Sequence, residues 1–164
     1  MSKNLYMKKI GEKAKLASVH LSNINIDKRN SVLKQFSKYL KTNVRSILNS
    51  NKKDISHAKS NKIKDSMIDR LKLNNKKIAQ IRNSIEKIIK FKDPLGKTLS
   101  SWKRPNGLII KRVSIPIGVI GVIYESRPNV TSDVSALCFK TGNVVILRGG
   151  SEAFHSNKIL AKLF

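Results

Sequence analysis

Two short polar turns, 125–129 and 148–152, contain the side chains of this sequence that are best placed to do chemistry. The first turn is Glu-Ser-Arg-Pro-Asn and the second is Arg-Gly-Gly-Ser-Glu. Each therefore combines a guanidinium group with a carboxylate and small polar groups. Such groups can bind anions and can donate hydrogen bonds to charge that develops during a reaction.

The segments around these turns predict a βαβα unit. Apolar, β-branched runs at 119–123 and 144–147 are typical of parallel strands buried on both faces. Between them, Val134, Leu137 and Cys138 have helical spacing, which predicts a buried stripe, and Gly142 is expected to end that helix. The crossover should be right-handed. Because ligands bind outside the carboxyl ends of parallel strands, both polar turns are predicted to lie at one site.

Ahead of this unit, the sequence predicts several helices whose apolar stripes we interpret as core packing. Residues 3–21 favour a first helix, and Asp27 is a plausible N-cap of a second one. The apolar stripe of that second helix continues from Val32 to Leu48 at 3.6-residue spacing. A short third helix is expected at 51–60. An apolar cluster begins at Met67, and a last helix at 75–91 is ended by Asp93-Pro94.

Residues 98–115 are different and predict two strands around a turn. Asn106-Gly107 is a dipeptide favoured in tight hairpins. Because an isolated hairpin is only marginally stable in water, we expect this one to pack on another domain or subunit.

Composition narrows the class of protein further. The 164 residues have a net charge of +24 and a single cysteine, which excludes an internal disulfide and is compatible with a reducing compartment. The sequence contains neither a signal peptide nor an apolar run long enough for a membrane span, so a cytoplasmic protein is expected. The lysines are scattered, and aromatic residues make up only 5%. We therefore expect a solvated lysine-rich surface rather than nucleic-acid binding.

The motifs at 113–157 resemble the aldehyde dehydrogenase superfamily and, within it, the γ-glutamyl phosphate reductase (glutamate-5-semialdehyde dehydrogenase) family. The resemblance rests on Ile-Pro-Ile-Gly-Val-Ile-Gly-Val-Ile-Tyr-Glu at 115–125, Arg-Pro-Asn-Val-Thr at 127–131, Lys-Thr-Gly-Asn at 140–143 and Ile-Leu-Arg-Gly-Gly-Ser-Glu at 146–152. Upstream, Met-Ile-Asp-Arg-Leu at 67–71 and Asp-Pro-Leu-Gly at 93–96 continue it. The implied fold is α/β, with N-terminal helices, a β-hairpin and the start of a Rossmann-like parallel sheet.

The resemblance also implies an activity, the NADPH-dependent reduction of L-glutamate 5-phosphate to L-glutamate 5-semialdehyde in proline biosynthesis. It implies that Asn129 stabilises the oxyanion, that Arg148, Ser151 and Glu152 lie at the ribose of NADP(H), and that Arg127 contacts the substrate. Structural alternatives stay open for most of these residues. Asn129 could cap a helix, Arg127 could pair with Glu125, and the Ser151-Glu152 pair could provide a helix cap and a first-turn charge.

The same resemblance divides the chain into parts and predicts that it is incomplete. Residues 1–97 would be the helical part of the cofactor domain, 98–115 a bridging element of a homo-oligomer, and 116–164 the first βαβα of the NADP-binding domain. The family's nucleophilic cysteine lies in a Thr-Cys-Asn segment, which is absent here. Cys138 is expected to be a core residue, and no metal site is expected. We therefore expect a fragment without a catalytic domain, inactive alone. The alternatives are a non-catalytic remnant that needs a partner half and, less favoured, a basic nucleic-acid-binding module.

Overall fold

The computed structural model describes residues 3–164, and the side chains from Leu5 onward. Five helices come first, then a hairpin, then a βαβα unit. The helices are α1 (Lys3–Ser22), α2 (Ile26–Thr42), α3 (Val44–Ser60), α4 (Asp65–Leu71), α5 (Asn75–Lys90), α6 (Pro128–Lys140) and α7 (Phe154–Leu163), with a 3-10 turn η1 (Ser151–Ala153) before α7. The strands are β1 (Thr98–Lys103), β2 (Ile109–Val113), β3 (Val119–Tyr124) and β4 (Val144–Gly149). The α/β architecture expected from the sequence is confirmed.

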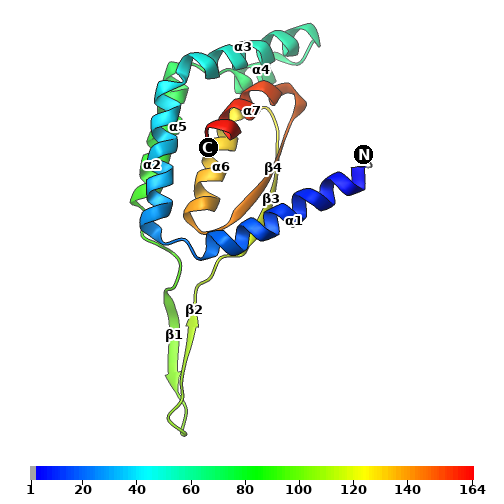
Figure 1. Cartoon of the computed structure of the whole chain (residues 1–164). Helices are drawn as coiled ribbons and strands as arrows, with labels where there is room; N and C mark the ends of the chain where they lie inside the picture. Colours follow the sequence, from blue (N-terminus) through cyan, green and yellow to red (C-terminus); the bar gives the residue numbers. More distant parts are fainter. Residues whose placement is uncertain (1–2) are drawn as a thin grey trace.

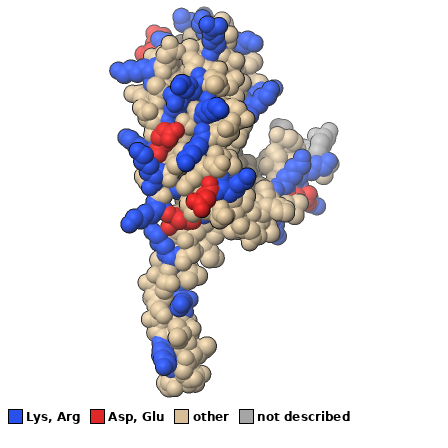
Figure 2. Space-filling view, turned by 60° about the vertical axis from the view of Figure 1, so that its left-hand side comes forward, with Lys and Arg blue, Asp and Glu red and all other residues tan. Residues whose placement is uncertain are grey.

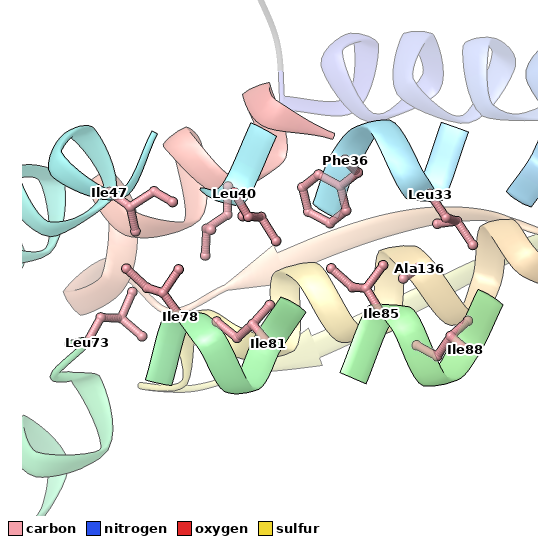
Figure 3. Packing of buried hydrophobic residues seen from close by; sticks show 11 residues of the cluster. Leu33, Phe36, Leu40, Ile47, Leu73, Ile78, Ile81, Ile85, Ile88 and Ala136 are labelled. Atoms are coloured by element: carbon pink, nitrogen blue, oxygen red, sulfur yellow. The ribbon is translucent and has the colours of Figure 1, made fainter. Parts of the chain in front are cut away.

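The main core joins the N-terminal helices to the βαβα unit. Apolar side chains of α2 and α5 face each other, and α6 and α7 add Ala136 and Leu160 to the same cluster (Figure 3). Leu33, Leu40, Ile47 and Ile85 are completely buried there. Because the cluster draws on both ends of the chain, the N-terminal helices directly support α6, the helix that follows the first polar turn.

The helix boundaries in the N-terminal half correct three of our predictions. The N-cap of α2 is Asn25, whose side chain accepts a hydrogen bond from the Lys28 N–H at 2.9 Å, and Asp27 lies inside the first turn. The apolar stripe that ends at Leu48 is also divided between two helices. Asn43 ends α2 with non-helical φ of −108° and ψ of 20°, its side-chain amide donates to the Tyr39 carbonyl at 2.9 Å, and α3 starts at the next residue. Residues 51–60 are the second half of α3 rather than a separate helix.

A polar cluster is buried between α2, α5 and α6. The guanidinium of Arg29 contacts the Asp93 carboxylate at 2.7 Å and also donates to the Lys140 carbonyl. The ammonium of Lys140 donates to the Asn30 side chain at 2.7 Å and to the Ile89 carbonyl at 2.9 Å. Arg29 and Lys140 are each only 2% exposed. These contacts fix the C-terminal end of α6 against the helical half.

The hairpin projects away from the rest of the molecule (Figure 1). Its strands β1 and β2 are antiparallel, and the loop between them contains Asn106 and Gly107 as predicted. Gly107 has φ of 86°, a left-handed conformation that glycine adopts without strain. Trp102 is 46% exposed and Ile109 is 60% exposed. Within the described chain, therefore, most of this hairpin is open to solvent.

β3 and β4 form a two-stranded parallel sheet, as predicted. The helices pack on one face of it, and the other face is open. Val119 and Ile123 point to the open face, and Ile123 is 85% exposed. The prediction that β3 is buried on both faces is therefore wrong for this structure, because no described element covers the second face.

The helix between the two strands ends as the sequence predicts but packs differently. Gly142 has φ of 69° directly after α6, so the left-handed end is confirmed. Cys138 is buried, whereas Leu137 is 43% exposed. The prediction that Leu137 is buried is wrong, because this side chain points away from the core that α6 forms with α5 and α7.

Candidate functional site

The two polar turns meet at the carboxyl ends of β3 and β4. The parallel register places Tyr124 opposite Gly149, so the turns leave the sheet side by side. One side chain then joins them directly. Glu152 accepts hydrogen bonds from the backbone N–H of Ser126 at 2.6 Å and from the Ser126 hydroxyl at 3.0 Å. The convergence predicted from strand order is therefore present.

Ser126 lies buried in the first turn. It is 3% exposed and has φ of 37°, an uncommon conformation for a residue with a side chain. The pKa of Glu152 reflects the same contact. Burial acts to raise the pKa of this carboxyl, but hydrogen bonds from its own backbone N–H and from Ser126 outweigh that effect and lower it. A charged Glu152 thus stabilises the strained turn, which is a structural role that the sequence did not indicate.

Two glycines in the second turn lie close to neighbouring side chains. A Cβ added to Gly150 would lie 2.1 Å from a Glu152 carboxylate oxygen, and one added to Gly149 would lie 2.2 Å from the Asn157 amide nitrogen. Gly149 also faces the Tyr124 ring, whose hydroxyl is 2.5 Å from that of Thr131. A side chain at position 149 or 150 would therefore have to displace the end of Asn157 or of Glu152.

Asn129 lies in the first turn of α6, partly buried, and its amide donates to the Asp133 carboxylate at 3.1 Å. The N-cap of α6 is Arg127, and no side chain caps this helix end. The alternative in which Asn129 caps the helix is therefore wrong. Asp133 was not predicted as a site residue, although its position four residues after Asn129 on a helix is a signal that could have identified it.

Asn129 and Asp133 line a small cleft of about 240 Å³, which we call the Asn129 cleft. Its other walls come from α4, α5 and the segment between them. Burial raises the pKa of Asp133, and the hydrogen bond from Asn129 acts in the opposite direction. The complete lining is Arg70, Leu73, Lys77, Gln80, Ile81, Ser84, Asn129 and Asp133.

The two predicted arginines lie at the surface near the turns. Arg127 is exposed, and the described part of the chain contains no ion pair between it and Glu125. The ion-pair alternative is therefore wrong. Arg148 is paired with Ile123 in the strand register and is exposed on the open face of the sheet. Neither arginine lines the Asn129 cleft.

Ser151 lies away from the Asn129 cleft. Our prediction that it caps the next helix is wrong. It lines a second cleft of about 620 Å³ with Lys53, His57 and His155. The first turn of α7 is capped instead by Asp54 of α3, which accepts from the backbone N–H groups of His155 at 2.9 Å and Ser156 at 2.7 Å. Asp54 is 2% exposed. This cap joins residues about one hundred positions apart, so no local motif could indicate it.

Other groups that could do chemistry give no site. Cys138 is 7% exposed, and burial raises the pKa of its thiol, which disfavours the reactive thiolate. Residues 3–164 contain no group of three or more His, Cys, Asp or Glu side chains that could hold a metal ion. None of the described helices is long and apolar enough to cross a bilayer. Lysine and arginine side chains are spread over the helical body on the face shown in Figure 2.

Comparison with known proteins gives one consistent answer. No family model matches the sequence. The chain is 50% identical over 151 residues to a γ-glutamyl phosphate reductase of Caldicellulosiruptor saccharolyticus, covering 92% of this chain and 36% of that protein. The crystal structure of γ-glutamyl phosphate reductase from Thermotoga maritima superposes with a TM-score of 0.90 at 41% identity, covering 93% of this chain and 37% of that one.

A more distant structure supports the fold alone. A Bacillus subtilis protein assigned to the aldehyde dehydrogenases is 18% identical and has a TM-score of 0.72, over 99% of this chain and 33% of its own length. The chain thus spans little more than a third of the relatives that it matches. Over nearly its whole length, the chain is similar in sequence and structure to part of the γ-glutamyl phosphate reductases, and it has the aldehyde dehydrogenase fold.

Proposed function

We propose that this chain forms the N-terminal part of an NADP(H)-dependent γ-glutamyl phosphate reductase. The reaction is the reduction of L-glutamate 5-phosphate to L-glutamate 5-semialdehyde and phosphate, in the cytoplasmic synthesis of proline. The observation that carries the proposal is the position of Asn129. Its amide belongs to the first of the two converging turns and lies at a polar cleft, in a chain that is 50% identical over 151 residues to a γ-glutamyl phosphate reductase.

Asn129 supplies a neutral donor for the negative charge that develops on the substrate carbonyl oxygen. One N–H of its amide is used by Asp133, and the second N–H has no partner within the described chain. A donor that is fixed before the reaction begins needs no reorganisation as the charge develops. Asp133 acts through Asn129 as a positioning residue.

The nicotinamide cofactor is proposed to bind along the end of β4. Arg148 is exposed there and has no partner among the described residues, so its guanidinium can contact the 2′-phosphate of NADP(H). Ser151 offers a hydroxyl in the next turn, and Glu152 maintains the shape of that turn through Ser126. NADPH, when bound, supplies the hydride. Gly149 and Gly150 add no side chains to this segment, so the backbone lies close to its neighbours.

The remaining parts of the proposal concern the substrate and the assembly. Arg127 is exposed at the first turn and can contact a phosphate or carboxylate of the substrate. The nucleophilic cysteine of the family lies outside these 164 residues, since Cys138 is buried and the Thr-Cys-Asn segment is absent. The projecting hairpin, with exposed Trp102 and Ile109, is the proposed contact with a second subunit of a homo-oligomer.

The proposal is tested by assaying the native polypeptide that contains these residues, purified from its own cells. Oxidation of NADPH is followed by absorbance with glutamate 5-phosphate as the substrate, and released phosphate is measured in parallel. We expect one phosphate for each NADPH consumed. Consumption of NADPH that does not depend on the acyl phosphate, or none at all, would exclude the proposed reaction.

A further inference from the structure

Three hydrogen-bonded side chains close the first polar turn, and we call them the Thr131 bridge. Tyr124 is the last residue of β3 and directly precedes the turn, whereas Thr131 lies on α6, two residues after Asn129. The Tyr124 hydroxyl is 2.5 Å from that of Thr131, and the Thr131 hydroxyl donates to the side-chain oxygen of Asn157 on α7 at 3.0 Å. The bridge therefore joins the two ends of the turn to each other and to α7.

The direction of these hydrogen bonds follows from the number of available protons. Thr131 has one hydroxyl proton, and the side-chain oxygen of Asn157 can only accept, so this proton is directed to Asn157. Tyr124 must then be the donor to Thr131. Burial raises the pKa of Tyr124, although its hydrogen bond to Thr131 acts in the opposite direction, so its hydroxyl stays protonated at neutral pH. Since Thr131 is only 1% exposed, water does not compete for either contact.

The Thr131 bridge also lies against the end of β4, where the second polar turn begins. A Cβ added to Gly149 would lie 2.2 Å from the Asn157 amide nitrogen and 3.1 Å from the Tyr124 hydroxyl. Both ends of the bridge are therefore close to the Gly149 backbone. The contact between Ser126 and Glu152 joins the two turns at one place, and the bridge joins them at a second.

The start of α6 depends on such distant contacts because it has no local cap. Arg127 is the N-cap residue, and its side chain forms no capping hydrogen bond. Asn129 lies in the first turn of this helix, and its amide donates to Asp133 of the same helix. That contact orients the Asn129 amide relative to α6 alone. The Thr131 bridge is what fixes the start of α6 relative to β3, β4 and α7.

We propose that Thr131 is a positioning residue of the reductase reaction, which holds the start of α6 so that the Asn129 amide meets the developing oxyanion. The inference rests on the proposed reductase function and adds to it a residue that acts through Asn129. A misplacement of about 1 Å at a reacting group can lower the rate about 100-fold. Because the contact between Ser126 and Glu152 would still hold the turn, we expect loss of the bridge to lower kcat about tenfold. KM should be unchanged, since the donor acts on charge that is present only in the transition state.

The test is a set of variants of the native polypeptide, assayed by NADPH oxidation with glutamate 5-phosphate. Thr131→Val replaces the hydroxyl with a methyl group, and kcat should fall about tenfold with KM unchanged. Thr131→Ser retains the hydroxyl and should recover most of the rate. Thr141→Val is the matched control, because the Thr141 hydroxyl donates to the Leu137 carbonyl at the other end of α6. This control should retain the wild-type kcat.

Combination with Asn129→Ala separates positioning from a general loss of stability. If Thr131 acts through Asn129, Thr131→Val causes no further loss of kcat once the Asn129 amide is absent. Losses that multiply in the double variant, or a wild-type kcat in Thr131→Val, would overturn the proposal. Should Thr131→Val fail to fold, Tyr124→Phe takes its place, since it retains the ring and removes only the donor to Thr131. The same results are expected of it, and the same outcomes would contradict the proposal.

Activity of the wild type decides the reductase function separately. An active wild type whose Thr131 and Asn129 variants have multiplying losses refutes only the role of Thr131. An inactive wild type refutes the reductase function, and the role of Thr131 with it.

Discussion

The contact between Asp54 and the start of α7 allows a quantitative prediction about stability. Asp54 is buried on α3 and accepts two backbone hydrogen bonds, at 2.9 and 2.7 Å, from the first turn of α7. Asp54→Ala removes both acceptors. Each donor left unsatisfied costs about 1–3 kcal/mol, and the lost charge at the helix N-terminus costs about 0.3–1 kcal/mol more. We therefore expect the free energy of unfolding to fall by about 3–5 kcal/mol.

A graded series separates this mechanism from a general effect of substitution. Asp54→Asn retains one acceptor oxygen and should cost less, about 1–2 kcal/mol. Glu86→Ala, on an exposed position of α5, should change stability by less than about 0.5 kcal/mol. The assay is urea unfolding of the 164-residue chain followed by far-ultraviolet circular dichroism. If Asp54→Ala is as stable as Glu86→Ala, the cap does not hold α7 in the way described here.

Three further predictions concern other contacts. Arg29→Met removes the partner of Asp93 and a donor to the Lys140 carbonyl, and should lower the free energy of unfolding by about 3 kcal/mol in the same urea assay; a loss below 1 kcal/mol would contradict this. Because the folded pKa of Glu152 is lowered, its stabilising effect is present above the unfolded value of about 4.3 and is lost as the pH falls through the folded value. Glu152→Gln should therefore flatten the loss of stability below about pH 4.3, and an acid profile like that of the wild type would refute this. Arg148→Gln should weaken NADPH binding to the native polypeptide roughly tenfold or more while sparing NADH, as measured by fluorescence titration, whereas equal losses would exclude a contact with the 2′-phosphate.

The parts of the fold that could be predicted from the sequence depend on local chemistry. The β-branched runs before residues 124 and 148 identified β3 and β4, and Gly142 identified the end of α6 because few other residues tolerate its φ of 69°. Strand order then brought the two polar turns together, which the contact between Ser126 and Glu152 confirms. The division of the long apolar stripe at Asn43 was missed, since the apolar spacing continues across this residue and only its backbone dihedral angles break the helix.

The parts that could not be predicted depend on contacts between distant residues. Asp54 and His155 are about one hundred positions apart, and so are Arg29 and Lys140. Neither pair leaves a pattern in the sequence, and Ser151 therefore seemed the better cap for α7. The Asn129 cleft was missed for the same reason, because three of its walls come from α4, α5 and α6. Asp133 alone had a local signal, its helical spacing from Asn129.

The most direct test of the account is the effect of Asn129→Ala on turnover by the native polypeptide. The variant removes the proposed donor to the developing oxyanion and leaves the helix cap unchanged, since Asn129 does not provide that cap. We expect NADPH oxidation with glutamate 5-phosphate to fall about 100- to 1,000-fold in kcat, with an unchanged circular dichroism spectrum. A variant that turns over at the wild-type rate would contradict the assignment of this chain's turns to the active site of a γ-glutamyl phosphate reductase.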